Sequence, residues 1–185
     1  MKKQVLFIHC AGVQGPSDGS NPLTAWLIEA LGEGYEVIAP RMPDQIEYAT
    51  WQNQLEVEMD KLTGEVILIG HSLGGTVLAK YLSEASPKIK VKSLHLVASP
   101  YWGRDPDWQN EGFTLTNSYH ADSLSACPVY IYHTQEDPVV PTAHAEHYLE
   151  YFPHATLRAL AGQDHYFMEG LPVLAEDMRV ISMSS

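Results

Sequence analysis

The chain is short of cysteine, of basic residues and of long apolar runs. Its 185 residues include two cysteines, Cys10 and Cys127, which are too few for a disulfide framework and fit a reducing compartment. Lysine and arginine total 11 against 23 acidic residues, and the resulting net charge of −12 disfavours nucleic acid, anionic membranes and polyanionic substrates as partners. No stretch approaches the roughly 20 apolar residues that a membrane-spanning helix needs. We therefore expect a cytoplasmic protein that binds neither nucleic acid nor membrane.

The chain also lacks internal repeats, low-complexity tracts and linkers, so we expect one domain over residues 1–185. Short apolar segments rich in β-branched residues predict six strands: residues 5–9, 36–39, 65–69, 93–98, 129–133 and 156–160. Apolar residues at helical spacing predict five helices: residues 22–31, 48–62, 73–82, 141–151 and 170–181. Asn21 is the expected cap of the first helix. Alternating strands and helices indicate an α/β fold with a parallel sheet covered on both faces.

One interval breaks this alternation. Residues 99–127 are rich in proline, glycine, tryptophan, aspartate and asparagine and offer no long periodic helix. An irregular stretch of that length inside a compact domain is usually functional.

The most informative motif is Gly70-His71-Ser72-Leu73-Gly74, a G-x-S-x-G pattern. It follows the apolar run 66–69 and precedes a predicted helix, which is the order that a nucleophile elbow needs. The tight turn puts the serine in a sparsely allowed backbone conformation, so the residues two positions away must be small. We predict that Ser72 is a catalytic nucleophile and that the adjacent His71 contacts substrate.

A serine hydroxyl needs a base to take its proton, and the base needs a carboxylate to hold it in the right tautomer. His165 is the best candidate base, because it lies in the loop between the last predicted strand and the last predicted helix. The other histidines suit core, surface or pocket-wall positions: His9, His71, His95, His120, His133, His144, His147 and His154.

Asp137 is the best candidate acid. It follows the fifth predicted strand in a loop that two prolines stiffen. Four other carboxylates compete with it, one beside it, two after the preceding strand and one beside the candidate base: Glu136, Asp105, Asp107 and Asp164.

An oxyanion hole needs two backbone N–H groups aimed at the developing negative charge. Leu73, directly after the candidate nucleophile, is placed to supply one of them. The second should come from the loop at residues 9–15, whose glycines allow a close backbone approach. Ala11 is our choice there, with Cys10 and Gly12 as alternatives.

With these residues in hand, the chain resembles the α/β-hydrolase family over essentially its whole length. The strand, elbow and helix around Ser72, the chain order of nucleophile, acid and base, and the oxyanion loop all match. It is most similar to the small, lidless serine hydrolases of the retinoblastoma-binding protein 9 and YdeN type. The Gly-rich loop after the first strand, Arg41-Met42-Pro43-Asp44 and the Asp-Pro-Val-Val-Pro loop at 137–141 carry that similarity.

The resemblance implies an α/β-hydrolase-like three-layer sandwich with about six parallel strands. The first two strands of the full family sheet are missing, and the lid is reduced to residues 99–127. Cys10 stands where many relatives carry glycine, which leaves the second oxyanion donor open.

We expect a serine hydrolase, a carboxylesterase or thioesterase, that acts on a small-molecule ester or thioester through an acyl-enzyme intermediate. We expect no cofactor, because the acyl-enzyme mechanism requires none. We also expect no metal, since His144 and His147 share a helix but have no evident third ligand. Tyr101 and Trp102, grouped with two further aromatics at 108 and 113, either contact the substrate or cover the sheet edge. The short lid region favours small, soluble substrates.

Two alternatives stay open. The same three residues can catalyse amide hydrolysis, acyl transfer or C–C cleavage, since fold and motif do not separate these reactions. The chain can also be a protein-binding module on a hydrolase scaffold. Nothing in the sequence fixes the oligomeric state.

Overall fold

The computed structural model describes residues 2–85, 87–116, 124 and 127–183. Its centre is a six-stranded sheet in the order β2-β1-β3-β4-β5-β6, and all neighbouring strands are parallel. The strands are β1 (Lys3–Ile8), β2 (Tyr35–Ile38), β3 (Glu65–His71), β4 (Lys90–Val97), β5 (Val129–Thr134) and β6 (Thr156–Leu160). The predicted six-stranded parallel sheet is therefore confirmed.

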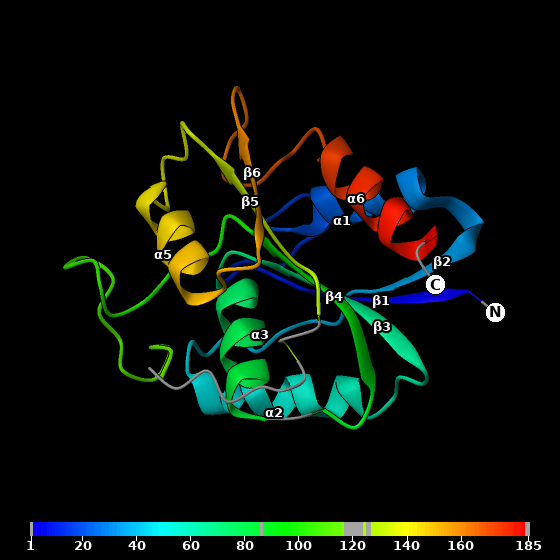
Figure 1. Ribbon diagram of the computed structural model, residues 1–185, viewed down its shortest axis with the longest axis horizontal. Coiled ribbons are helices and arrows are strands. Elements are labelled where there is room, and N and C mark those ends of the chain that lie inside the picture. The colour runs from blue at the N-terminus through cyan, green and yellow to red at the C-terminus, as the bar shows by residue number, and fades with distance from the viewer. Residues whose placement is uncertain (1, 86, 117–123, 125–126, 184–185) are drawn as a thin grey trace.

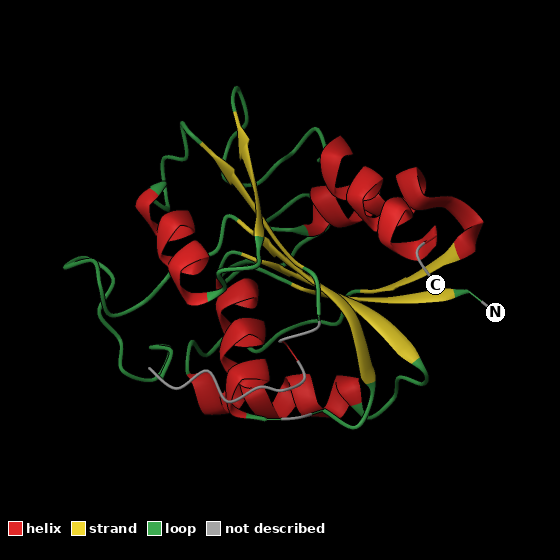
Figure 2. Ribbon diagram, viewed as in Figure 1, coloured by secondary structure: helices red, strands yellow, loops and turns green. Residues whose placement is uncertain are grey.

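Helices cover both faces of the sheet, as the ribbon views show (Figures 1 and 2). They are α1 (Asn21–Leu31), the short 3₁₀ helix η1 (Gly32–Gly34), α2 (Tyr48–Met59), α3 (Leu73–Glu84), α5 (Ala143–Tyr151) and α6 (Pro172–Met183). Helices α1 and α6 lie on one face, and α2, α3 and α5 lie on the other. This is the three-layer arrangement that the sequence predicts.

The side of the sheet that each helix takes follows from the strand order. The chain steps from β1 outward to β2, then returns past β1 to β3 and continues toward β6. Crossovers between parallel strands are right-handed in nearly all proteins, so connections that step in opposite directions lie on opposite faces. Helix α1 therefore takes one face, and the helices of the later crossovers take the other.

Each face of the sheet carries its own hydrophobic core. Successive strand residues point to opposite faces, so Leu6 and Leu68 pack with α2, α3 and α5, while Phe7 and Ile69 pack with α1 and α6. Continuous apolar runs such as 66–69 are the consequence, because both faces of these strands are buried.

Several element ends differ from the predicted ones. Strand β4 begins at Lys90, three residues early, and α2 ends at Met59, three residues early. The cap of α1 is Ser20, and the expected cap Asn21 is the first helical residue. Its side chain instead donates a 2.7 Å hydrogen bond to the carbonyl of Gly15.

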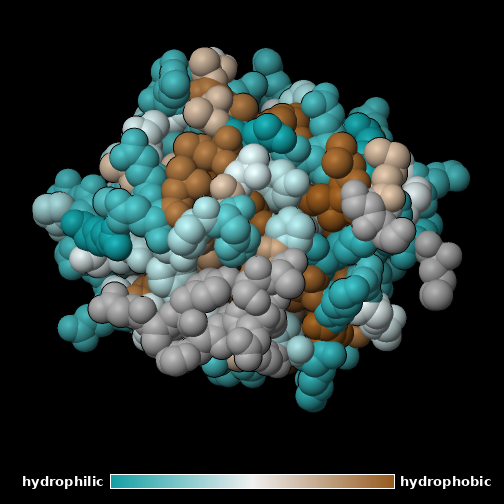
Figure 3. Space-filling model, viewed as in Figure 1, coloured by the Kyte–Doolittle hydropathy of each residue, from teal (hydrophilic) through white to brown (hydrophobic). Residues whose placement is uncertain are grey.

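Of the predicted irregular stretch, residues 99–116 form turns and bends, and residues 117–123 and 125–126 lie outside the described residues. Across the described ranges, no helix is both long and apolar enough to cross a membrane. The face seen in Figure 3 is mostly hydrophilic, with separate apolar patches.

Candidate active site

Loops at the carboxyl ends of the strands gather the candidate residues. The strand order reverses between β1 and β3, which are neighbours in the sheet. In open α/β sheets, ligands bind outside the carboxyl ends of the strands at such a switch point. The loop with Ala11 follows β1, and Ser72 follows β3.

Ser72 occupies the sharp turn that joins β3 to α3. Its φ of 52° and ψ of −122° lie in a region that non-glycine residues rarely adopt. Two glycines make the turn possible by letting backbone pack directly on backbone. A Cβ at Gly74 would meet the carbonyl oxygen of Ile8, and a Cβ at Gly70 would meet the backbone of Gly75.

Ser72 and His165 line one cavity of about 260 Å³. Most of the wall is apolar, and it contains two tryptophans but no lysine or arginine. The lining residues are Cys10, Ala11, Ile46, Ser72, Leu73, Pro100, Trp102, Trp108, Val139, His165 and Tyr166.

His165 and Asp137 form a buried hydrogen-bonded pair. The Nδ1 atom of His165 lies 2.9 Å from Oδ2 and 3.2 Å from Oδ1 of Asp137. Oδ1 of Asp137 also accepts the N–H groups of Val139 and Val140, both at 2.8 Å. Because an ionised carboxylate only accepts, Nδ1 of His165 carries the proton and Nε2 of the neutral ring is left as a base.

The environment keeps the Asp137 carboxylate charged. Burial alone would raise its pKa, but the hydrogen bonds from His165 and from the amides of Val140 and Val139 outweigh burial and lower the pKa below its usual value. At neutral pH this residue is therefore an anion beside the imidazole.

No hydrogen bond joins Ser72 Oγ to His165 Nε2, although the structure describes both residues on the wall of the same cavity. In free enzymes, hydrogen bonds of this kind are often long and tighten only when substrate binds. The arrangement is therefore compatible with transfer of the serine proton to His165.

Two residues that line this cavity have a backbone N–H with no acceptor in the described part of the chain. Leu73 is the first residue of α3, so its N–H has no partner within the helix. Ala11 also lines the cavity, and its N–H bonds to no described residue. The N–H of Cys10 is occupied, because it donates to Ser20 Oγ at 2.8 Å. Gly12 lines a neighbouring cavity and not this one.

The structure brings Trp102 to the cavity but leaves two other expected contacts away from it. Tyr101 is buried and packs edge-on against Tyr148, with ring centroids 5.1 Å apart. His71 is fully buried and does not line the cavity, and both of its ring nitrogens form hydrogen bonds inside the protein. The structure therefore places neither His71 nor Tyr101 on the wall of this cavity, where the sequence-based prediction had them contact substrate.

None of the four rival carboxylates hydrogen-bonds to His165, and all four are described. Glu136 accepts the N–H of Gly162, and Asp164 accepts two amides of its own loop. The carboxylate of Asp105 lies 3.5 Å from a different histidine, His144, and accepts the N–H of Asp107.

Several cavity residues had not been singled out from the sequence, among them Ile46, Val139 and Tyr166. Val139 lies in the loop at 137–141 and Tyr166 directly follows His165, so their closeness to the candidate acid and base was a local signal. Ile46 belongs to no motif, and no local signal marks it. Among the described residues, no group of three or more histidine, cysteine, aspartate or glutamate side chains is placed to hold a metal ion.

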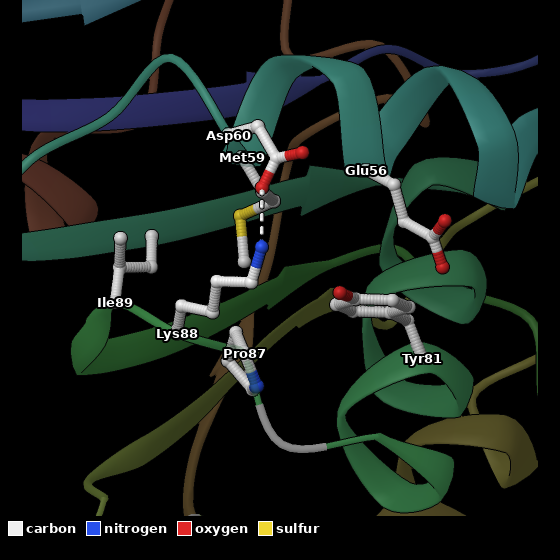
Figure 4. A pocket seen from close by; sticks show the side chains of 7 residues that line it. All are labelled: Glu56, Met59, Asp60, Tyr81, Pro87, Lys88 and Ile89. Carbon is white, nitrogen blue, oxygen red and sulfur yellow. Dashed lines mark ion pairs between the residues drawn. The ribbon is translucent and has the colours of Figure 1, made fainter.

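A separate cavity of about 230 Å³ opens beside the C-terminal half of α2 and α3 (Figure 4). Lys88 and Asp60 form an ion pair of 3.8 Å in its wall. The wall contains no serine, cysteine or histidine, so it offers no pair of nucleophile and base. Its residues are Glu56, Met59, Asp60, Tyr81, Pro87, Lys88 and Ile89.

Comparisons with known proteins identify the family and the fold. A family model described as serine hydrolase matches residues 19–169. The ydeN gene product from B. subtilis has a similar structure, with a TM-score of 0.80 and 18% identity over 99% of this chain and 100% of that one. No curated protein matches the chain by sequence.

Two further solved structures have the same fold. Est1E from Butyrivibrio proteoclasticus gives a TM-score of 0.67 at 15% identity, over 98% of this chain and 87% of that one. A pyrethroid hydrolase from Sphingobium faniae JZ-2 gives 0.68 at 16%, over 100% and 98% of the two chains. At such identities the likeness establishes the fold alone.

Proposed function

The chain belongs to the serine hydrolase family, and from that premise we propose that it is a carboxylic ester hydrolase of the carboxylesterase or thioesterase type. Ser72 is the nucleophile, His165 the base and Asp137 the acid of its triad. The observation that carries the proposal is the 2.9 Å contact between His165 Nδ1 and Asp137 Oδ2, with His165 on the wall of the cavity that Ser72 lines.

The reaction takes two steps. Ser72 Oγ attacks the carbonyl carbon while its proton moves to Nε2 of His165, and the tetrahedral oxyanion is held by the N–H groups of Leu73 and Ala11. His165 then gives the proton to the leaving alcohol or thiol, and an acyl-enzyme remains. Water attacks this ester, His165 takes the water proton, and the same proton returns to Ser72 as the acid is released.

Asp137 keeps its negative charge throughout. It holds Nδ1–H of His165, fixes the tautomer and stabilises the imidazolium that forms in each step. The lowered pKa of its carboxyl suits this role, because a neutral acid would not stabilise that cation.

The cavity supports a neutral acyl group of modest size. Its described wall carries Trp102 and Trp108 but no cationic side chain that could pair with an anionic acyl group. Its volume of about 260 Å³ is near the lower end of typical ligand pockets, which begin at roughly 300 Å³. We therefore propose esters or thioesters with short aliphatic or aromatic acyl groups as the substrates.

The first test is labelling with a fluorophosphonate probe, followed by peptide mass spectrometry. We expect one adduct, at Ser72, that is lost in Ser72→Ala and in His165→Ala. Ser17→Ala is the matched control, because this exposed serine lines only the neighbouring cavity. A folded wild-type protein that takes no label, or an adduct at another residue, would overturn the proposal.

A panel of p-nitrophenyl esters, thioesters and anilides then identifies the bond that is cleaved. We expect ester or thioester turnover with acetyl to hexanoyl or benzoyl groups, and much slower turnover of a succinyl monoester. Faster cleavage of the anilides would favour amide hydrolysis by the same triad.

A further inference from the structure

We propose that Ser20 and His71 are positioning residues, joined in a directed hydrogen-bond chain that links the oxyanion loop to the backbone of His165. The inference rests on the proposed function, because it assigns these two residues to the same catalytic centre. Neither residue lines the cavity, so both act through others.

The hydrogen-bond chain consists of three contacts of equal length. The N–H of Cys10 donates to Ser20 Oγ at 2.8 Å, Ser20 Oγ lies 2.8 Å from Nδ1 of His71, and Nε2 of His71 lies 2.8 Å from the carbonyl oxygen of His165. Ser20 and His71 are fully buried. These links therefore hold four positions that are far apart in the sequence.

The donor and the acceptor of each hydrogen bond in this hydrogen-bond chain can be assigned. A carbonyl oxygen only accepts, so Nε2 of His71 must carry a proton toward His165. Burial first, and then the nearby His165 ring, lower the pKa of His71 to about 3, so the ring is neutral and Nδ1 is an acceptor. Ser20 must then donate to Nδ1, which leaves its oxygen lone pairs for the Cys10 amide.

The helix at Ser20 supplies an independent observation. Serine at a helix N-cap usually bonds an N–H of the first turn, which is worth about 1 kcal/mol. Ser20 is the N-cap of α1, yet it makes no side-chain cap hydrogen bond. Its hydroxyl bonds instead to Cys10 and His71. Helix α1 therefore lacks a side-chain cap, and the Ser20 hydroxyl is used in the hydrogen-bond chain.

One consequence concerns the oxyanion loop. Ser20 occupies the Cys10 amide, whereas the next N–H along the loop, that of Ala11, bonds to no described residue and belongs to a residue of the cavity wall. The Ser20 hydroxyl thereby sets the orientation of the loop directly before the proposed donor.

A second consequence concerns the base. Asp137 holds the ring of His165, and His71 holds its carbonyl oxygen. His71 directly precedes Ser72 in the sequence. Its hydrogen bond to the carbonyl of His165 therefore connects the turn that carries the nucleophile to the backbone of the base. Two points of attachment restrict the approach of the ring to Ser72.

The test compares Ser20→Ala with Thr24→Val. Thr24 lies one turn later in α1, is also buried, and donates a 2.8 Å hydrogen bond to the Ser20 carbonyl, so its loss removes a buried hydrogen bond outside the chain. For the ester that wild type cleaves best, we expect Ser20→Ala to lower kcat about 10- to 100-fold, less than outright loss of an oxyanion donor. Its KM should change less than about 3-fold, and Thr24→Val should stay within about 2-fold in both.

Restoring the hydroxyl provides a rescue. Ser20→Thr should recover most of the lost kcat, because it returns a donor and an acceptor to the same place. A kcat equal in Ser20→Ala and Thr24→Val, or an effect confined to KM, would overturn the proposal.

An NMR measurement on the wild-type protein tests the chain without relying on activity or on a variant that folds. In a multiple-bond ¹H–¹⁵N spectrum at neutral pH, His71 should show the neutral Nε2–H tautomer. The Nδ1–H tautomer, or a charged ring, would refute the chain. If this tautomer is found but no ester, thioester or anilide is cleaved and no probe binds, the proposed function fails while the hydrogen-bond chain stands.

Discussion

Nδ1 of His165 lies 2.9 Å from Oδ2 of Asp137, and their side chains are only 2% and 0% exposed. An imidazole and a carboxylate that share a hydrogen bond away from water constrain each other strongly. Water cannot replace either partner, so a change at one of them alters the hydrogen bonding of the other.

Asp137→Asn should reduce kcat by about 10⁴-fold with little change in KM, because the amide no longer enforces the Nδ1–H tautomer of His165. Steady-state kinetics on the best ester measures this. Glu136→Gln is the matched control one residue earlier, and it keeps an oxygen to accept the Gly162 amide. Equal losses in the two variants would contradict the assignment of the acid.

Gly74→Ala should destabilise the protein strongly, by about 3 kcal/mol or more, because the added methyl group meets the carbonyl oxygens of Ile8 and His9. Urea denaturation measures the loss. Gly34→Ala is the control, since a Cβ there meets nothing within 4 Å and its φ is not positive. A stable, fully active Gly74→Ala variant would show that the elbow does not need this close packing.

Lowering the pH should destabilise the fold already at pH values above those at which carboxylates take up protons. Burial lowers the pKa of both His71 and His95 to about 3, whereas an exposed histidine has a value of 6.5. Below pH 6.5 the unfolded chain therefore binds protons that the folded protein does not, so stability falls as the pH drops from 6.5 toward 3.

Each of these two histidines contributes about 1.4 kcal/mol per pH unit in that window. We expect the free energy of unfolding to be at least about 4 kcal/mol lower at pH 5 than at pH 7. In His95→Gln the same difference should shrink by about 2 kcal/mol. Urea denaturation at the two pH values measures it, and equal stability at both would contradict the prediction.

Both cysteines should be unreactive in the native protein. Cys10 and Cys127 are buried, and burial raises the pKa of each thiol, that of Cys127 to about 12. Since the thiolate is the reactive form, Ellman's reagent at pH 7.5 should titrate both thiols only after unfolding. Rapid native reaction at Cys10, with loss of esterase activity, would point instead to an accessible thiol beside Ser72.

The parts of the fold that local sequence determines were predicted well. The apolar run at 66–69 is buried on both faces and could be recognised as a central strand. The start of β4 was missed, because residues 90–92 contain two lysines. They join the strand through pairing with β3, where Lys90 sits opposite Glu65 and forms an ion pair with it. Pairing with a distant strand cannot be recognised from the sequence around residues 90–92 alone.

In the site too, features set by local sequence could be predicted, whereas features set by distant contacts could not. The α/β-hydrolase resemblance drawn from the motifs is confirmed by the family match and the fold. The roles of Ser72, Asp137 and His165 remain predictions, though the loops bring them to one edge of the sheet. The sequence could not show that His71 lies off the cavity wall, because its hydrogen-bond partners are Ser20, 51 residues earlier, and the carbonyl of His165, 94 residues later.

The sheet order has a consequence for heating. Ser72 and the oxyanion loop follow β3 and β1, which have neighbours on both sides, whereas His165 follows β6, an edge strand paired only with β5. Edge elements open locally at lower free energy than the centre of a sheet. We therefore expect warming to displace β6 and the loop that carries His165 at a lower temperature than that at which the central strands unfold. Cooling should reverse this step, because the central strands remain folded and β6 can pair again with β5.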